Sequence, residues 1–276
     1  MTLGPRETSE LLRRHGLAPR RSRGQNFVVD PNTVRRIARL AGVGPGDHVV
    51  EIGAGLGALT RALLDTGAEV TAIEVDEGLV GVLAEVVPDA TIMHADALAM
   101  DWTSLLHDEP AVLVGNLPYN VATPIVADLL DGVPLIRRML VMVQAEVGER
   151  LVAGPGSKIY GGVSVKVAYW ANAAVVGRVP PTVFLPQPKV DSALVAIERR
   201  DVPAGPPGVL PDDLFALVRA GFGQRRKTLR RSLAGLADEE DFAAAAVDPG
   251  ARAEQLDVDA WGRLALAVRA RSGGAT

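Results

Sequence analysis

The feature that most constrains the fold is the alternation of apolar runs and helical patterns between residues 47 and 144. The alternating segments are, in order, HVVEI, LTRALLD, EVTAIEV, GLVGVLAEV, ATIMH, AVLVG, IVADLL and RRMLVMVQ. Strands that alternate with helices predict a parallel sheet with right-handed crossovers. Strands as apolar as AVLVG suit a sheet covered on both faces. We therefore expect an α/β, Rossmann-like sheet.

The remainder of the chain predicts an edge hairpin and a helical region. Two strand candidates, AAVVGRV and SALVAIERR, are joined by the proline-rich PPTVFLPQPK, and an antiparallel hairpin at the sheet edge is expected. The segments AEVGERLVA and GVSVKVAYWA before this hairpin predict helices. Beyond DVPAGPPGVLPDD all patterns are helical: LFALVRAGF, KTLRRSLAGLA, EDFAAAAV and DAWGRLALAVRA. We predict domains at 1–204 and, all-helical and smaller, at 205–276.

Composition excludes several classes of protein. The 276 residues include no cysteine, which removes disulfides, thiolate metal sites and Cys nucleophiles. The four histidines are scattered, so no metal site is expected. No apolar run reaches the roughly 18 residues of a membrane span, and the N-terminal segment MTLGPRETSE has no apolar signal core. A cytoplasmic protein without membrane contact is expected.

Two basic segments stand out against a net charge of −4. The first lies within residues 11–23 and the second within 219–231, and neither contains an acid. Such a run alone is typical of a solvated helix face. Local positive charge is also what phosphate binding requires, so both segments are candidates for contacting nucleic acid. The candidate residues are Arg20, Arg21, Arg23, Arg225, Arg226, Lys227, Arg230 and Arg231.

A glycine-rich turn between the first strand and helix of this region predicts a nucleotide-type site. Gly53 and Gly55 stand in EIGAGLG, where glycines let the backbone approach a ligand closely. Glu74 ends the second strand at the distance where an acid bonds both ribose hydroxyls, and Asp96 follows the third strand, where an adenine amine is a possible donor. Each acid could instead cap the next helix. NAD and S-adenosylmethionine share the adenosine half, so these residues leave both open.

The end of the fourth strand favours a methyltransferase. Asn116, Leu117, Pro118 and Tyr119 follow one another there. An exocyclic adenine amine is a weak nucleophile, and acceptors at the Asn116 side chain and the Leu117 carbonyl would direct its lone pair at a sulfonium methyl group. Pro118 fixes the backbone, and Tyr119 offers a ring for base stacking. The alternative is an ordinary Asn-Pro turn with a core tyrosine.

With these residues in hand, the chain resembles the ribosomal RNA adenine dimethyltransferase family almost end to end. The residues that carry the resemblance are Gly24 to Val28, EIGAGLGALT, Ile73 to Asp76, Gly115 to Asn120, PPTVFLPQPKVDSALV and FGQRRKTLRRSL. The resemblance implies cofactor contacts from Asn26, Val28, Gly53, Glu74, Asp96 and Asn116. It also implies that Phe184 faces Tyr119 across the target base, although Phe184 could be a buried loop anchor.

The resemblance implies dimethylation of adenosines near the 3′ end of small-subunit (16S) rRNA, with S-adenosyl-L-methionine as donor. The expected partner is rRNA in a partly assembled small subunit, and the expected protein is a monomer that serves ribosome biogenesis. Two alternatives remain: a large-subunit rRNA adenine methylase of the macrolide-resistance type, and a non-enzymatic assembly factor. An NAD dehydrogenase is remote, because the crevice lacks a His or Lys for proton transfer.

Overall fold

The chain forms two compact units in the computed structural model, which describes residues 3–20, 24–118 and 121–273. The first unit comprises Met1–Gly148 and Ala174–Arg199, and the second, here called the helical unit, comprises Glu149–Ala173 and Arg200–Thr276. The predicted domains divide the chain differently, because they assign residues 149–173 to the sheet domain. These residues group with the helical unit because Tyr160, Val165 and Tyr169 belong to its core.

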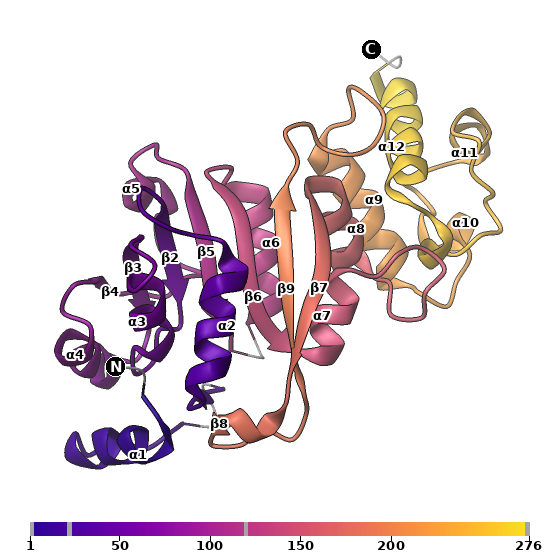
Figure 1. Cartoon of the computed structure of the whole chain (residues 1–276). Coiled ribbons are helices and arrows are strands. Elements are labelled where there is room, and N and C mark those ends of the chain that lie inside the picture. Colours follow the sequence, from indigo (N-terminus) through magenta and orange to yellow (C-terminus); the bar gives the residue numbers. More distant parts are fainter. Residues whose placement is uncertain (1–2, 21–23, 119–120, 274–276) are drawn as a thin grey trace. The chain divides into compact units, whose positions relative to one another are not determined.

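A seven-stranded sheet organises the first unit (Figure 1). Its strand order is β4-β3-β2-β5-β6-β9-β7. The strands from β4 to β6 pair in parallel, while β9 pairs antiparallel with β6. The expected parallel sheet with an antiparallel edge is confirmed. The strands are β2 (His48–Ile52), β3 (Glu69–Glu74), β4 (Thr91–His94), β5 (Ala111–Asn116), β6 (Ile136–Gln144), β7 (Ala171–Val179) and β9 (Ser192–Arg199).

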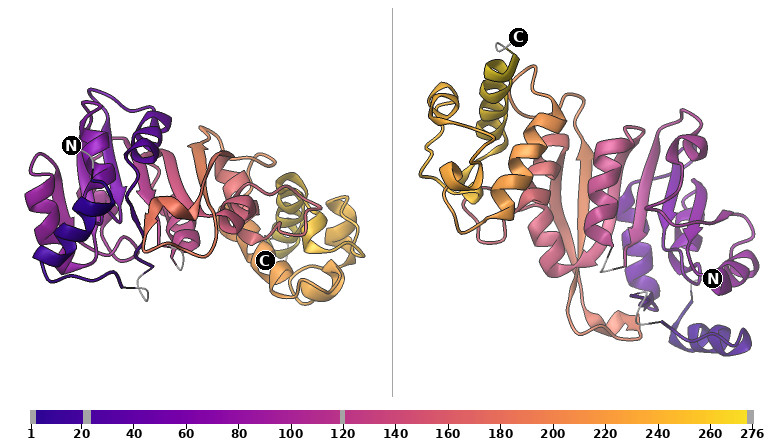
Figure 2. Two further views of the ribbon diagram at one scale, coloured as in Figure 1. Left: turned by 60° about the horizontal axis from the view of Figure 1, so that its bottom comes forward. Right: turned by 180° about the vertical axis from the view of Figure 1, so that it is seen from behind.

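Helices lie on both faces of the sheet. Seen from the front and from behind, α2 covers one face and α6 the other (Figures 1 and 2). This covering explains why the parallel strands are apolar on both sides. The helices up to the end of β6 and just after it are α1 (Pro5–Arg14), α2 (Pro31–Ala41), α3 (Ala58–Leu64), α4 (Glu77–Val86), α5 (Trp102–Leu106), α6 (Ala122–Gly132) and α7 (Ala145–Leu151).

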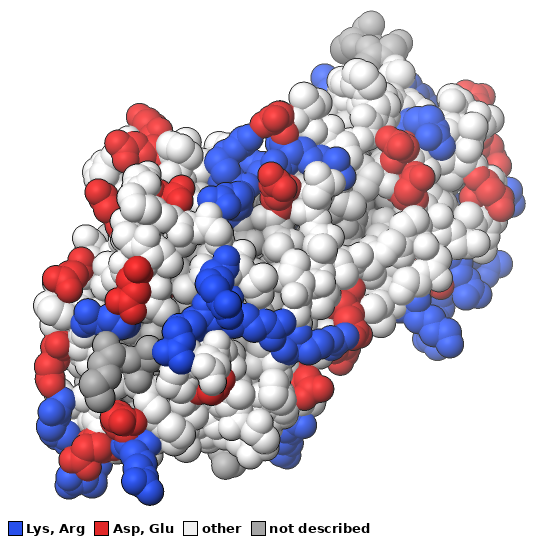
Figure 3. Space-filling view, viewed as in Figure 1, with Lys and Arg blue, Asp and Glu red and all other residues white. Residues whose placement is uncertain are grey.

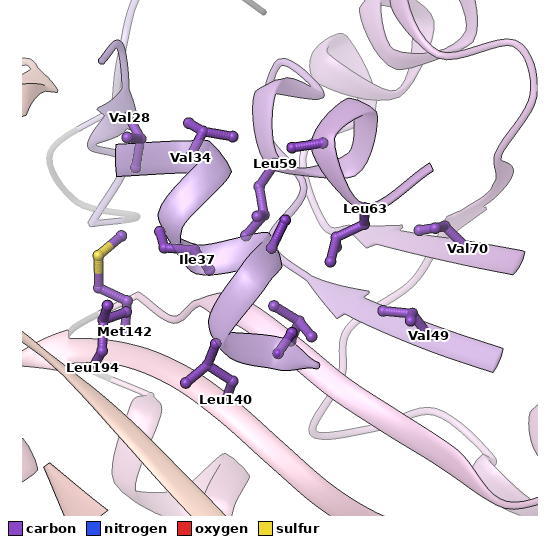
Figure 4. Packing of buried hydrophobic residues seen from close by; sticks show 14 of the residues in the cluster. Val28, Val34, Ile37, Val49, Leu59, Leu63, Val70, Leu140, Met142 and Leu194 are labelled. Atoms are coloured by element: carbon purple, nitrogen blue, oxygen red, sulfur yellow. The ribbon is translucent and has the colours of Figure 1, made fainter. Parts of the chain in front are cut away.

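Helix α2 shows how local sequence and packing agree. Asp30 begins it, with a side chain that accepts a hydrogen bond from the Thr33 N–H at 2.7 Å, and Gly42 ends it in the left-handed conformation. Val34 and Ile37 are fully buried and point toward the sheet (Figure 4). Burial of each such aliphatic side chain contributes about 1.5–3 kcal/mol.

A second, two-stranded sheet was not predicted. Strand β1 (Phe27–Val28) pairs antiparallel with β8 (Phe184–Leu185), so that Val28 lies opposite Phe184. Strand β8 follows a short 3-10 helix, η2 (Pro181–Val183), in the connection from β7 to β9. The pairing therefore brings the segment at residues 24–28 beside a loop that is distant in sequence.

The helical unit has its own core. Trp261, Phe242 and Tyr160 are each at most 2% exposed in it. The Tyr160 hydroxyl donates to the Leu256 carbonyl at 3.1 Å. Within the described part of the chain, no helix is long and apolar enough to cross a membrane. The elements are α8 (Gly162–Trp170), α9 (Pro211–Gly223), α10 (Leu229–Ser232), α11 (Glu239–Ala244), η3 (Ala253–Gln255) and α12 (Val258–Gly273).

Candidate active site

A pocket lies where the parallel strands β2, β3 and β5 end. Ile52 stands opposite both Ile73 and Gly115 in the register, so the carboxyl ends of the three strands are level. Ligands of open α/β sheets bind outside this edge. The predicted residues that line the pocket are Asn26, Val28, Gly53, Gly55, Glu74, Asp96, Asn116 and Pro118.

The glycine-rich turn forms one wall of the pocket. Gly53 and Gly55 have φ angles of 74° and 59°, in the left-handed region that side chains disfavour. A Cβ atom at Gly55 would stand 3.0 Å from the Phe27 ring, so a side chain there would also crowd the β1 strand. The sequence requires glycine here for conformation and for space, and the turn consequently exposes backbone to the pocket.

Glu74 has a structural task that sequence reasoning missed. One of its carboxyl oxygens accepts the N–H of Gly55 at 2.9 Å, and the other accepts the N–H groups of Val75 and Asp76, both at 2.9 Å. Burial raises the pKa of this carboxyl, while the three N–H donors oppose the rise. Glu74 therefore ties the glycine-rich turn to the end of β3, at the position predicted for the ribose.

The segment before β1 is fastened to the same edge of the sheet. The Asn116 side-chain nitrogen donates to the Asn26 carbonyl at 2.9 Å. The Gln25 side chain donates to Asp76 at 3.0 Å, and Arg20 forms an ion pair with Asp76 at 3.5 Å. These contacts explain why the motif Gly24 to Val28, far from the strand ends in sequence, belongs to the pocket.

Asp96 occupies the pocket at its open side. The residue is exposed, and one of its carboxylate oxygens accepts the N–H of Leu98 at 2.9 Å. This turn is the type in which an aspartate fixes the backbone two residues later. The carboxylate retains acceptor capacity, because each of its oxygens can take more than one hydrogen bond.

The charges around the pocket select the ligand. The titratable residues among its described lining residues are Glu51, Glu74 and Asp96, and none is Lys, Arg or His. Such a lining suits a ligand with net positive charge and disfavours the anionic pyrophosphate of NAD. S-adenosylmethionine carries a sulfonium and an ammonium group against one carboxylate, and it fits these residues. Glu74 and Asp96 would hold its adenosine half.

Three predicted catalytic residues differ in their placement. Asn116 and Pro118 line the pocket, whereas Leu117 is 1% exposed and donates its N–H to the Met142 carbonyl at 3.0 Å. Tyr119 lies outside the described residues. Phe184 is 4% exposed and packs in the core with Val28 and other apolar residues. This burial agrees with a loop anchor, and stacking on a base would require Phe184 to leave the core.

The predicted RNA-binding residues separate into two groups. Arg225 donates to the carbonyls of Lys158 and Tyr160 and pairs with Glu254 at 3.1 Å, so it holds the helical unit together. Arg230 pairs with Glu239 at 2.7 Å.

The second group is exposed. Arg226, Lys227 and Arg231 have no side-chain partner in the part of the chain that the structure describes. Figure 3 shows basic side chains gathered along the lower edge of the helical unit. Arg21 and Arg23 lie outside the described residues.

One residue of the pocket escaped sequence reasoning altogether. Glu51, the last-but-one residue of β2, is 1% exposed and lines the pocket. Its position directly before the glycine-rich turn was the available signal. Among the described residues, no cluster of His, Cys, Asp and Glu could hold a metal ion.

Sheet, strand-end pocket and acidic lining together define a Rossmann-like, S-adenosylmethionine-dependent methyltransferase. The chain belongs to the ribosomal RNA adenine dimethylase family, whose sequence model matches residues 16–269.

Similar proteins agree with this assignment. The chain is 47% identical to "Ribosomal RNA small subunit methyltransferase A" of Streptomyces coelicolor, over 95% of this chain and 96% of that protein. Identity to the protein of the same name from Cutibacterium acnes is 49%, over 97% of this chain and 94% of that protein. Among solved structures, the 23S rRNA methyltransferase ErmE is 28% identical, with a TM-score of 0.69 over 88% of this chain and all of that chain.

Proposed function

We propose that this protein dimethylates the exocyclic amine of adenosines near the 3′ end of small-subunit rRNA and thereby serves ribosome biogenesis. The observation that carries the proposal is the likeness to proteins named as small-subunit methyltransferases, at 47% and 49% identity over nearly the whole of both chains. The donor is S-adenosyl-L-methionine. The partner is rRNA in a partly assembled small subunit, met by a monomer in the cytoplasm.

Asn116 is the residue that positions the target amine. Its side-chain nitrogen is occupied by the Asn26 carbonyl, which directs the amide so that its oxygen remains as an acceptor. This oxygen accepts a hydrogen from the adenine amine and stabilises the positive charge that develops on the amine nitrogen. The Leu117 carbonyl is the second acceptor, and Tyr119 and Phe184 are the stacking rings.

No strong general base is required at this site. The bound donor supplies an activated methyl group, and the amine loses its proton only after it has become cationic. The protein therefore contributes position and electrostatics. The Asn116 oxygen and the pocket that holds the donor are the parts that must be in place, and both belong to the first unit.

RNA is held by charges outside the pocket. Arg226, Lys227 and Arg231 are the phosphate-contacting residues of the helical unit, because they are exposed and lack ion-pair partners among the described residues. Arg20, Arg21 and Arg23 serve the same purpose beside the pocket. Arg225 and Arg230 contribute charge to the RNA surface while they also form contacts within the helical unit.

Methyl transfer to isolated ribosomal subunits tests the proposal. Unmodified small subunits are incubated with the protein and S-adenosylmethionine labelled in its methyl group, and Asn116→Ala serves as the control. We expect incorporation into small-subunit rRNA that approaches two methyl groups per modified adenosine. Incorporation no greater than that of the Asn116→Ala variant would refute the activity.

A second candidate is methylation of large-subunit rRNA. It is favoured by the structural likeness to a 23S rRNA methyltransferase, at a TM-score of 0.69 and 28% identity. The higher identity to small-subunit enzymes favours the first candidate. Primer extension on both rRNAs after the reaction separates the two, because dimethylated adenosine stops the polymerase at the modified position.

A further inference from the structure

The carboxyl group of Glu51 is buried beside the cofactor pocket without a complete set of partners. The residue is 1% exposed, and its Oε2 atom has no hydrogen-bond partner among the described residues. The hydroxyl of Thr60, on α3, is buried and unpartnered in the same sense. Buried polar atoms in native proteins almost always have a partner. An orphaned carboxyl oxygen that lines a pocket therefore indicates a ligand.

The surroundings of Glu51 favour its neutral form in the free protein. Burial raises its pKa to about 8, and the negative charge of Glu74 adds to this rise, while the nearby Thr60 hydroxyl opposes it. Asp96 is the remaining titratable residue among the described residues of the lining, which include no base. Nothing in the described pocket therefore compensates a negative charge on Glu51.

A cationic ligand reverses this balance. The sulfonium and ammonium groups of the methyl donor bring positive charge into a pocket that contains three acids. Positive charge near a buried carboxyl favours the ionised form strongly, because the surroundings screen it poorly. An uncharged nucleoside offers no such compensation.

We propose that Glu51 is protonated in the free protein, and that the cationic methyl donor displaces this proton on binding, so that the Glu51 carboxylate balances the ligand's charge. The proton passes to the solvent buffer, and no other bond forms or breaks. The inference rests on the proposed use of S-adenosylmethionine. Its consequences are selectivity for the charged donor over neutral nucleosides, and an affinity that increases between pH 6 and pH 8.

Calorimetry of ligand binding in several buffers tests this inference directly. The full-length protein is titrated with S-adenosylmethionine at pH 7 in phosphate, HEPES and Tris, whose ionisation enthalpies differ. The slope of the observed enthalpy against the ionisation enthalpy gives the number of protons released. A group with a pKa of about 8 is about nine-tenths protonated at pH 7, so we expect a release of about 0.9 proton per ligand bound.

Two variants identify the source of the proton. Glu51→Gln keeps the shape but cannot ionise, and its proton release should fall to nearly zero. Glu77→Gln, a matched change at an exposed acid outside the pocket, should leave the release at the wild-type value. The ligand's own amino group, with a pKa near 7.7–8.0, contributes equally to all three proteins and cancels in the comparison. Thermal melting checks that each variant is folded.

Other ligands complete the test. Adenosine carries neither positive charge, so its binding should release no proton. S-adenosylhomocysteine keeps only the ammonium group, so release with it assigns the ammonium as the partner and loss of release assigns the sulfonium. Binding of S-adenosylmethionine without proton release, or with release unchanged in Glu51→Gln, would overturn the inference and leave the proposed function intact. Absence of any binding would overturn both.

Discussion

Asn116 is held so that one half of its side chain is committed and the other half is available. Its nitrogen donates to the Asn26 carbonyl at 2.9 Å, which orients the oxygen as an acceptor for the adenine amine. We expect Asn116→Ala to lower the single-turnover rate of methylation by about 100- to 1000-fold, the usual loss on removing one preorganised polar group from a transition state. A rate within a few-fold of the wild type would contradict this role.

Glu51 also predicts how the stability of the free protein depends on pH. Its pKa is raised from 4.5 to about 8 on folding, so between these values the unfolded chain is ionised while the folded protein keeps the proton. The folded state then binds more protons, and the free energy of unfolding falls as pH rises, by about 1.4 kcal/mol per pH unit.

The Glu51→Gln variant should lose this component. Urea unfolding at pH 5.5, 6.5 and 7.5 measures the slope in the wild type and in the variant, and other titrating groups cancel in the difference. We expect the variant to gain stability relative to the wild type as pH rises. Equal slopes in the two proteins would show that Glu51 ionises freely in the folded state.

At the scale of elements, the β1–β8 pair connects the Gly24 to Val28 motif with the loop after β7. Phe184 forms its centre and is 4% exposed. Phe184→Ala should therefore lower the free energy of unfolding by about 3–5 kcal/mol, as is usual for removal of a buried aromatic ring. Urea unfolding measures the loss. A loss below about 1 kcal/mol together with a large fall in methylation would instead favour the stacking role.

The sequence predicted the elements that have a long period and missed those that lack one. The seven strands of the main sheet alternate with helices, and their apolar runs are long enough to recognise. Strands β1 and β8 have two residues each, so they have no periodicity and depend on a contact between distant segments. The segment KTLRRSLAGLA forms only the short helix Leu229–Ser232, because a left-handed Gly235 follows soon after.

The same reasoning explains which site residues were predictable. Gly53, Gly55, Asp96 and Asn116 follow from their places at strand ends, and the structure brings them to one pocket. The hydrogen bonds from Glu74 to the glycine-rich turn and the burial of Glu51 depend on three-dimensional packing. No spacing in the sequence reports how strongly a carboxyl group is desolvated.

At the scale of the whole molecule, the exposed basic residues of the helical unit should control RNA affinity. We expect the triple variant Arg226→Glu, Lys227→Glu and Arg231→Glu to bind small subunits at least tenfold more weakly and with a smaller dependence on salt, because fewer counterions are released. Filter binding at several salt concentrations measures both quantities. Cofactor affinity by calorimetry should be unchanged, since none of the three residues lines the pocket.

A matched control uses acids on the same unit. Asp212→Asn and Glu240→Gln each remove one exposed negative charge and should leave subunit binding equal to or slightly stronger than that of the wild type. An unchanged affinity in the triple arginine and lysine variant would exclude these residues from the RNA surface.

The central claim is that this chain methylates adenosines of small-subunit rRNA, and mapping of the modified nucleotides tests it most directly. Unmodified small and large subunits are treated separately with the protein and S-adenosylmethionine, and the rRNA fragments are then analysed by mass spectrometry. The account predicts dimethyladenosine near the 3′ end of small-subunit rRNA, none in large-subunit rRNA, and none with Asn116→Ala. Dimethyladenosine found only in large-subunit rRNA, or in neither RNA, would contradict it.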